Sequence, residues 1–199
     1  ALPIFQDIDF TKLPKSFVIK TNNSCGTVIV VKDKNKLNQN ACRRKLNVWL
    51  KDNYGIRSGQ LHYSKIVPKI LIERCLQQDG NISTSLIDYK FFCFHGIVKY
   101  ILVIYNRDLN THSFIRQFYD LNWNRIAVDD DDSESISKPK SLKKMIHIAE
   151  VLSQSLSFVR VDLYEVNNRP YFGELTFTPG FDQSMVYNKL NLGDFIDLN

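Results

Sequence analysis

Runs of apolar residues predict β-strands in two parts of the chain. In the first part the runs are short, and they lie at residues 17–20, 27–31 and 69–76. In the second part they are longer and rich in aromatic and β-branched residues, at 88–94 and 97–105. His95-Gly96 separates these two longer runs, and glycine accepts the positive φ that a two-residue hairpin turn requires. The pattern therefore predicts antiparallel hairpins in both parts.

Two other segments have helical periodicity. Residues 36–51 carry apolar side chains among basic ones and stop before Asn53-Tyr54-Gly55, which predicts a helix that ends there. In residues 139–157 the apolar positions recur at steps of three and four, namely Leu142, Met145, Ala149, Leu152 and Leu156. This stripe predicts an amphipathic helix packed on a core. Strands and helices in this order predict an α+β fold, or a mixed sheet with helices against it.

The last two predicted strands, 158–165 and 171–178, form a hairpin that carries acidic residues. Strand alternation places Arg160, Asp162 and Tyr164 on one face of the first strand, and Phe172, Glu174 and Thr176 on one face of the second. A three-residue loop at 167–169 would set Asp162 opposite Glu174. A two-residue turn, Asn167-Asn168, would instead set Asp162 opposite Gly173, and the sequence leaves both registers open.

Opposed carboxylates on neighbouring strands destabilise each other unless a cation lies between them. Asp162, Glu174 and the Thr176 hydroxyl are hard oxygen ligands of the kind that Mg²⁺ prefers. A surface network in which Arg160 neutralises both acids fits the same pattern equally well.

Length and composition fit a folded chain of one domain or two small lobes, with 199 residues and 44% hydrophobic content. No apolar run approaches the roughly 18 residues of a membrane span, so none is predicted. The net charge of +5 and pI near 9.0 come from dispersed basic residues, which by themselves do not indicate nucleic-acid binding. The chain starts at Ala1 without a leader, so we expect an upstream segment to be missing. The acidic run 129–134 is expected to be a solvated loop.

The cysteines are widely spaced single residues at positions 25, 42, 75 and 93. They contain no C-x-x-C pair, so neither a zinc site nor a disulfide framework is predicted. We expect a reducing, cytoplasmic compartment.

Several charged residues are candidates for binding a nucleotide. Lys20 precedes the loop 21–26, whose backbone N–H groups could cradle phosphate oxygens, although a solvated strand end would look the same. Glu73 lies in an apolar run, where a carboxylate requires a donor such as a ribose hydroxyl or Arg74. Asp88 and Lys90 share a strand face and could serve a ribose and a phosphate, or form cross-strand ion pairs.

These segments together resemble the ATP-grasp family, and in detail its TupA-like branch of teichuronopeptide biosynthesis. The resemblance runs from Ile8 to Asp182. It is carried by F-V-I-K at 17–20 with its small-residue loop, Ile72-Glu73, D-Y-K-F-F-C-F at 88–94, V-R-V-D-L-Y at 159–164 and F-G-E-L-T-F-T-P-G at 172–180.

The resemblance implies two α+β lobes with ATP held between antiparallel sheets. Residues 1–76 would form the small lobe with a phosphate flap, and residues 77–199 the large lobe with a metal-binding hairpin. The family also has an N-terminal domain and a further ATP-binding lysine upstream, which this chain does not contain. Either the sequence is truncated or this branch does without them, and in the first case we expect an incomplete catalyst.

The resemblance also assigns roles to individual residues. Lys20, Ser24 and Gly26 would bind ATP phosphates, Glu73 the adenine and Asp88 the ribose, with Lys90 beside them. Asp162, Glu174 and Thr176 would hold Mg²⁺, with Thr176 standing where the family usually has Asn. Arg160 would stabilise the charge of the transferred phosphoryl group, so that Arg160 and Lys20 are the candidate catalytic residues.

The implied activity is that of an ATP- and Mg²⁺-dependent carboxylate–amine ligase of cell-surface polysaccharide biosynthesis. Its partners would be a nucleotide and a small-molecule or polysaccharide acceptor. Two alternatives stay open, a sugar kinase on the same fold and a non-catalytic module that binds a nucleotide or a glycan. Candidates for an acceptor groove are Tyr63, Arg116, Trp123 and Arg125, although packing is the favoured role of Trp123.

Overall fold

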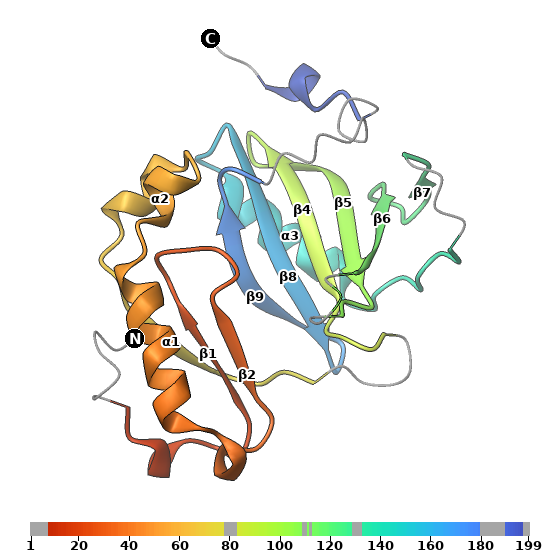
Figure 1. The fold of residues 1–199 in the computed structure, drawn as a ribbon. Coiled ribbons are helices and arrows are strands. Elements are labelled where there is room, and N and C mark those ends of the chain that lie inside the picture. The colour runs from red at the N-terminus through yellow and green to blue at the C-terminus, as the bar shows by residue number, and fades with distance from the viewer. Residues whose placement is uncertain are drawn as a thin grey trace. The chain divides into compact units, whose positions relative to one another are not determined.

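The chain forms two compact units, residues 1–76 and 77–199 (Figure 1). The structure is a computed structural model, and it describes residues 8–77, 83–108, 111, 113–128, 133–179 and 190–196. Within this described part, no helix is long and apolar enough to cross a membrane. Of the acidic run 129–134, residues 129–132 lie outside the described residues.

The first unit is a three-stranded antiparallel sheet with helices on one side. The strands are β1 (Phe17–Thr21), β2 (Val28–Val31) and β3 (Ile70–Arg74), in the order β2-β1-β3. The helices are α1 (Gln39–Lys51) and the short α2 (Tyr54–Arg57). The inward side chains of the sheet and of α1 form one core together with Ile8, made of Ile8, Phe17, Ile19, Val31, Cys42, Leu46 and Ile70. The opposite face of the sheet carries Lys20 and Glu73.

The helix predicted from residue 36 begins later. Residues Lys34–Lys36 form a separate 3-10 turn, and α1 begins after Asn38, whose side-chain oxygen accepts a hydrogen bond of 2.9 Å from the Ala41 N–H. This is the capping that an N-cap Asn provides, because the first helical N–H groups have no partner within the helix. Helix α2 was not predicted, because Asn53-Tyr54-Gly55 is also a typical helix-stop sequence.

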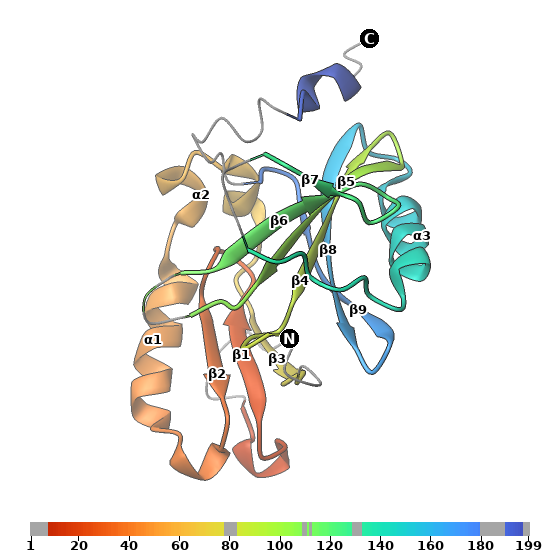
Figure 2. The ribbon, with the colours of Figure 1, turned by 90° about the vertical axis from the view of Figure 1, so that its right-hand side faces the viewer.

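The second unit is a six-stranded antiparallel sheet with α3 (Leu142–Ser153) on one face (Figure 2). The strand order is β7-β6-β5-β4-β8-β9. The strands are β4 (Asp88–Phe94), β5 (Ile97–Tyr105), β6 (Ile115–Tyr119), β7 (Arg125–Ile126), β8 (Phe158–Val166) and β9 (Arg169–Thr176). The main core lies between α3 and the sheet, and includes Tyr89, Phe91, Ile101, Met145, Ala149, Val159 and Val161.

The face of this sheet away from α3 is divided into an apolar and a charged part. In the apolar part the buried side chains are Phe92, Phe94, Leu102 and Phe118, and Phe195 of the short segment 190–196 packs on Phe94 with ring centroids 5.5 Å apart. Strand β4 is buried almost throughout. It lies between β5 and β8, and side chains pack on both of its faces. Alternation places Lys90 on the same face as Phe92, so the charged part begins on this central strand.

Predicted and observed elements of the second unit agree for the long strands. The His95-Gly96 turn is confirmed, with φ of 48° and 77°, and it joins β4 to β5 at the predicted residues. Helix α3 is shorter than the predicted 139–157, and Leu152 of its stripe is 40% exposed whereas Ser153 is buried. Strands β6 and β7 were not predicted.

Candidate functional site

The β8–β9 hairpin combines features of both predicted registers. Asn167 and Asn168 form a two-residue turn, with φ of 52° and 58°, and Val166 pairs with Arg169. Leu163 then pairs with Phe172, but Asp162 pairs with Glu174, since Gly173 is an extra residue in β9. The three-residue loop was therefore wrong, while the pairing of Asp162 with Glu174 is present through a β-bulge.

The bulge also corrects the predicted faces of β9. Residues that pair directly in an antiparallel ladder project to the same side of the sheet. Glu174 and Thr176 pair with Asp162 and Arg160, so they share the charged face. Phe172 pairs with Leu163 instead, on the opposite face, and the expectation that Phe172 lies beside Glu174 is wrong.

Five side chains meet on this face, and we call them the charge cluster: Lys90, Arg160, Asp162, Glu174 and Thr176. Asp162 is 2% exposed and accepts hydrogen bonds from Lys90 Nζ and from two nitrogens of Arg160, Nε at 2.7 Å and Nη2 at 2.8 Å. Lys90 lies directly opposite Asp162 on the neighbouring strand. The cross-strand ion pair that the sequence left open for Lys90 is thus present, and both oxygens of Asp162 are engaged by cations of the protein.

The outer edge of the charge cluster is more open. The Glu174 side chain is 63% exposed, and its Oε1 lies 3.7 Å from Arg160 Nη2. The Thr176 hydroxyl donates to this Oε1 at 3.1 Å and accepts from Arg160 Nη2 at 3.1 Å. Arg160 therefore contacts both acids and the hydroxyl. The cluster is electrically balanced, with two cationic and two anionic side chains.

The cluster fits a divalent cation only in part. Glu174 and Thr176 present hard oxygens at an open edge, as Mg²⁺ requires. Asp162 presents none in this arrangement, because Arg160 and Lys90 occupy its carboxylate. Among the described residues, no group of three or more His, Cys, Asp or Glu side chains could hold a metal ion. Asp162 could become a ligand only if one of its two cations turned away.

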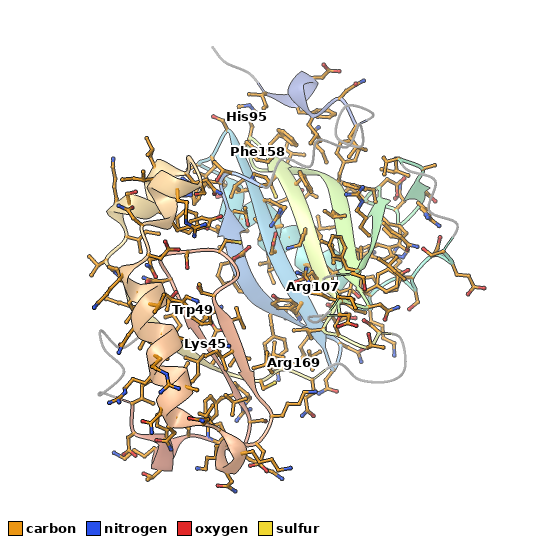
Figure 3. All side chains as sticks on the ribbon, viewed as in Figure 1. Lys45, Trp49, His95, Arg107, Phe158 and Arg169 are labelled. Carbon is orange, nitrogen blue, oxygen red and sulfur yellow. The ribbon has the colours of Figure 1, made fainter. Side chains whose placement is uncertain are left out.

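Asp88 lies next to the charge cluster and is also paired. Its Oδ2 accepts a hydrogen bond of 2.9 Å from Arg107 Nη2, and its side chain is 13% exposed. Figure 3 shows Arg107 just beyond the end of β5. Burial, together with the charge of Asp88 and a hydrogen bond to it, raises the pKa of the nearby Tyr164 hydroxyl, which therefore stays protonated. A ribose would have to displace Arg107 to reach Asp88, and no sequence signal identified Arg107 beforehand.

In the first unit, Lys20 and Glu73 form an ion pair of 2.8 Å. They come from the neighbouring strands β1 and β3, and half of the Glu73 side chain is exposed, at 49%. Two expectations are corrected here. Glu73 is not a carboxylate inside an apolar environment, and its partner is Lys20 rather than Arg74.

The loop 21–26 is anchored at its start and open at its tip. Asn22 donates to the Val67 carbonyl at 3.1 Å, and Asn23 Nδ2 donates to the Trp49 carbonyl at the end of α1, at 2.9 Å. Ser24 bonds to the Thr27 hydroxyl at 2.9 Å. Gly26 has φ of 77° and no atoms within 4 Å of the position of an added Cβ. Cys25 and Gly26 at the tip are exposed, and the loop follows β1, the strand that carries Lys20.

The predicted acceptor-groove residues have other contacts. Trp123 stacks on Tyr119 with ring centroids 4.3 Å apart, and its indole N–H donates to the Ile136 carbonyl at 3.0 Å. Packing is thus the role of Trp123. Arg125 donates to the Ser133 carbonyl, and Tyr63 packs edge-on against Tyr54 in the first unit.

Comparisons with known proteins agree with this arrangement of elements. A search of curated protein sequences gave no match. The D-alanine–D-alanine ligase of Bacillus anthracis complexed with ATP matches with a TM-score of 0.52 and 20% identity, over 96% of this chain and 55% of that one. Another structure of this ligase has a TM-score of 0.47 and 19% identity, over 96% and 56% of the two chains.

The corresponding ligase of Helicobacter pylori has a TM-score of 0.42 and 16% identity, over 93% of this chain and 48% of that one. The chain thus spans about half the length of these ligases. At this identity, the match with a TM-score above 0.5 shows a shared fold. The family model of the TupA-like ATPgrasp proteins matches residues 3–196, nearly the whole sequence. The chain therefore belongs to the TupA-like ATPgrasp family and has the ATP-grasp fold.

Proposed function

We propose that this chain supplies the ATP-binding part of an ATP-dependent carboxylate–amine ligase. The observation that carries the proposal is the convergence of Lys90, Arg160, Asp162 and Glu174 on one face of the large sheet. Two cations held by hydrogen bonds beside two acids suit a polyphosphate, because charges already placed at the site need little reorganisation when the phosphoryl group moves. Membership of the family and the fold shared with an ATP-bound ligase support this proposal.

Some residues of the charge cluster would bind phosphate, and others would bind the metal ion. Lys90 and Arg160 would contact phosphate oxygens, and Arg160 would stabilise the negative charge of the transferred phosphoryl group. Mg²⁺ arriving with ATP would be held by Glu174 and Thr176, with Asp162 joining if Arg160 turned to the phosphate, and it would supply further neutralisation of phosphate charge. In this proposal the ion pairs of Asp162 keep the buried carboxylate satisfied while the site is empty of nucleotide.

In the first unit, Lys20 and the open tip of the loop would bind the phosphates. The backbone N–H groups of the loop residues Ser24 to Gly26 would donate to phosphate oxygens, and Lys20 lies one residue before the end of the adjoining strand β1. The family resemblance assigns Glu73 to the adenine and Asp88 to the ribose. To bind the nucleotide, Glu73 would have to release Lys20, and Asp88 would have to release Arg107.

The proposed reaction has two steps. The γ-phosphoryl group of ATP is transferred to a carboxylate oxygen of the acceptor, with release of ADP, and an amine then attacks the acyl phosphate carbon and expels phosphate. The protein contributes mainly positioning and charge stabilisation. We propose a uronic-acid-type carboxylate of a surface polysaccharide as the acceptor, a choice that rests on the resemblance to the TupA-like branch alone.

Titration calorimetry with Mg·ATP tests the nucleotide site directly. We expect Glu174→Gln and Lys20→Ala each to weaken binding at least tenfold, and Glu134→Gln, an exposed acid outside the charge cluster, to leave it unchanged. Unchanged affinity in both site variants would refute the assignment. Product analysis then separates the reactions, because a ligase requires an amine for turnover whereas a sugar kinase does not.

A further inference from the structure

Charge is distributed unequally between the two units. Residues 1–76 contain 14 Lys and Arg against 5 Asp and Glu, whereas residues 77–199 contain 12 against 16. The modest net charge of the chain thus combines a strongly basic unit with a mildly acidic one. An excess of this size on one unit creates a local field that favours anionic partners.

Much of this excess lies on α1 and the residues that follow it. Residues 39–69 hold seven Lys and Arg and a single acid, Asp52. On α1, Cys42 and Leu46 are buried against the sheet, while Arg43, Arg44 and Lys45 are exposed. None of these three cations forms an ion pair with a residue that the structure describes. Figure 3 shows Lys45 on this helix. The outer side of α1 is therefore a basic surface without internal compensation.

The same region exposes large apolar side chains. Val48, Ile56, Leu61 and Val67 are 67%, 64%, 65% and 71% exposed. They come from α1, from α2, from the 3-10 turn Leu61–Lys65 and from the segment before β3. Figures 1 and 2 both show α1 and α2 on the same side of the β1–β3 sheet. Exposed cations and exposed apolar side chains thus alternate over one stretch of the first unit, which we call the outer surface (residues 43–67).

We propose that the outer surface docks peripherally on a bilayer that contains anionic phospholipid. Basic side chains are attracted to the negative headgroups, and neighbouring apolar side chains are buried at the boundary of headgroups and acyl chains. A soluble polyanion would satisfy the cations but offers no apolar layer to Val48, Ile56 and Leu61, so the combination favours a membrane surface. Docking of this kind is separate from the nucleotide site and does not depend on the proposed function.

Sedimentation with vesicles tests the proposal on the 199-residue chain. We expect the protein to bind vesicles of phosphatidylcholine and phosphatidylglycerol at equal amounts, to bind pure phosphatidylcholine vesicles far less, and to be released by salt. R43Q/R44Q/K45Q should lower the partition coefficient roughly a hundredfold, at about fivefold for each charge. The matched control K140Q/K143Q/K144Q removes three exposed charges from the second unit and should leave binding unchanged.

An apolar variant distinguishes a membrane from a soluble polyanion. V48S/I56S/L61S keeps every charge, and we expect it to weaken vesicle binding at least tenfold while binding to heparin is unaltered. These side chains are mostly exposed, so the melting temperature should not change, and circular dichroism checks this. Three outcomes would overturn the proposal. The apolar variant could bind vesicles as well as the wild type, the wild type could bind neutral vesicles as well as anionic ones, or the wild type could fail to bind vesicles.

Discussion

Gly173 lies directly against the backbone of Asp162, so that a Cβ atom at position 173 would be 2.9 Å from the Asp162 carbonyl oxygen and 3.0 Å from Tyr164 Cε2. This close approach occurs at the bulge that brings Asp162 opposite Glu174. Glycine is required here because the obstructing carbonyl is backbone and cannot rotate away.

Gly173→Ala should therefore destabilise the hairpin. We expect the free energy of unfolding to fall by about 1–3 kcal/mol, as in other overpacked sites. Urea unfolding measures this change. Gly193→Ala is the matched control, since no atom lies within 4 Å of its added Cβ, and it should be close to neutral. Equal stability of the two variants would mean that the Asp162 carbonyl oxygen is farther from position 173 than described.

Asp162→Asn should be strongly destabilising even without ligand. The change removes the carboxylate that balances Lys90 and Arg160, and Lys90 is 8% exposed. Loss of one partner of a buried ion pair costs about 3–5 kcal/mol. Chemical denaturation would show this, and Glu174→Gln, which alters an acid that is 63% exposed, should cost less than about 1 kcal/mol.

A double-mutant cycle tests whether the effect at Asp162 comes from Lys90. The cost of Asp162→Asn should be smaller in a Lys90→Met background, because the unpaired buried ammonium is then absent. Strictly additive effects would show that the two residues do not interact.

Asn23→Asp should loosen the loop that carries Ser24 and Gly26. Asn23 Nδ2 donates to the Trp49 carbonyl at the end of α1, and an aspartate cannot donate. Its negative charge would also face the negative end of the helix dipole. We expect the free energy of unfolding to fall by about 2 kcal/mol, measured by chemical denaturation. Asn22→Asp, which changes a less buried neighbour, is the comparison, and it should cost less.

Alkaline pH should destabilise the second unit through Cys93. Burial raises the pKa of this thiol to about 11, from an ordinary value near 9.0. Because the folded-state pKa is the higher one, the contribution to stability is complete below about pH 9 and disappears as the pH rises through 11. Between pH 8 and 11, the free energy of unfolding of the wild type should fall by about 2–3 kcal/mol more than that of Cys93→Ala, measured by denaturation. Parallel pH profiles would exclude the thiol as the cause.

The elements that could be predicted from sequence were those with local signals. Strands β4 and β5 have continuous apolar runs and a His95-Gly96 turn between them, and α3 has a clear stripe. Strands β6 and β7 have mixed patterns and become strands because the edge of β5 offers a partner to β6, and β6 in turn offers one to β7.

The site depended more on contacts between distant parts of the chain. Lys90 and Asp162 lie 72 residues apart, and Lys20 and Glu73 come from strands that meet only in the folded sheet. Sequence spacing shows which residues share a strand face but not which strand lies opposite. For this reason the acids of the hairpin and the possible role of Arg160 between them were identified, whereas the pairing of Lys90 with Asp162 and of Lys20 with Glu73 was not.

The extra residue Gly173 affects the bend of β9 but not the pairing of the hairpin residues on either side of it. If Gly173 were deleted, Leu163 would still face Phe172 and Asp162 would still face Glu174, in an uninterrupted ladder. The meeting of the two acids is thus compatible with two chain lengths, and the additional glycine changes the local bend of the strand. Hairpins one residue shorter would conserve the pairing while pointing the end of the strand in a different direction.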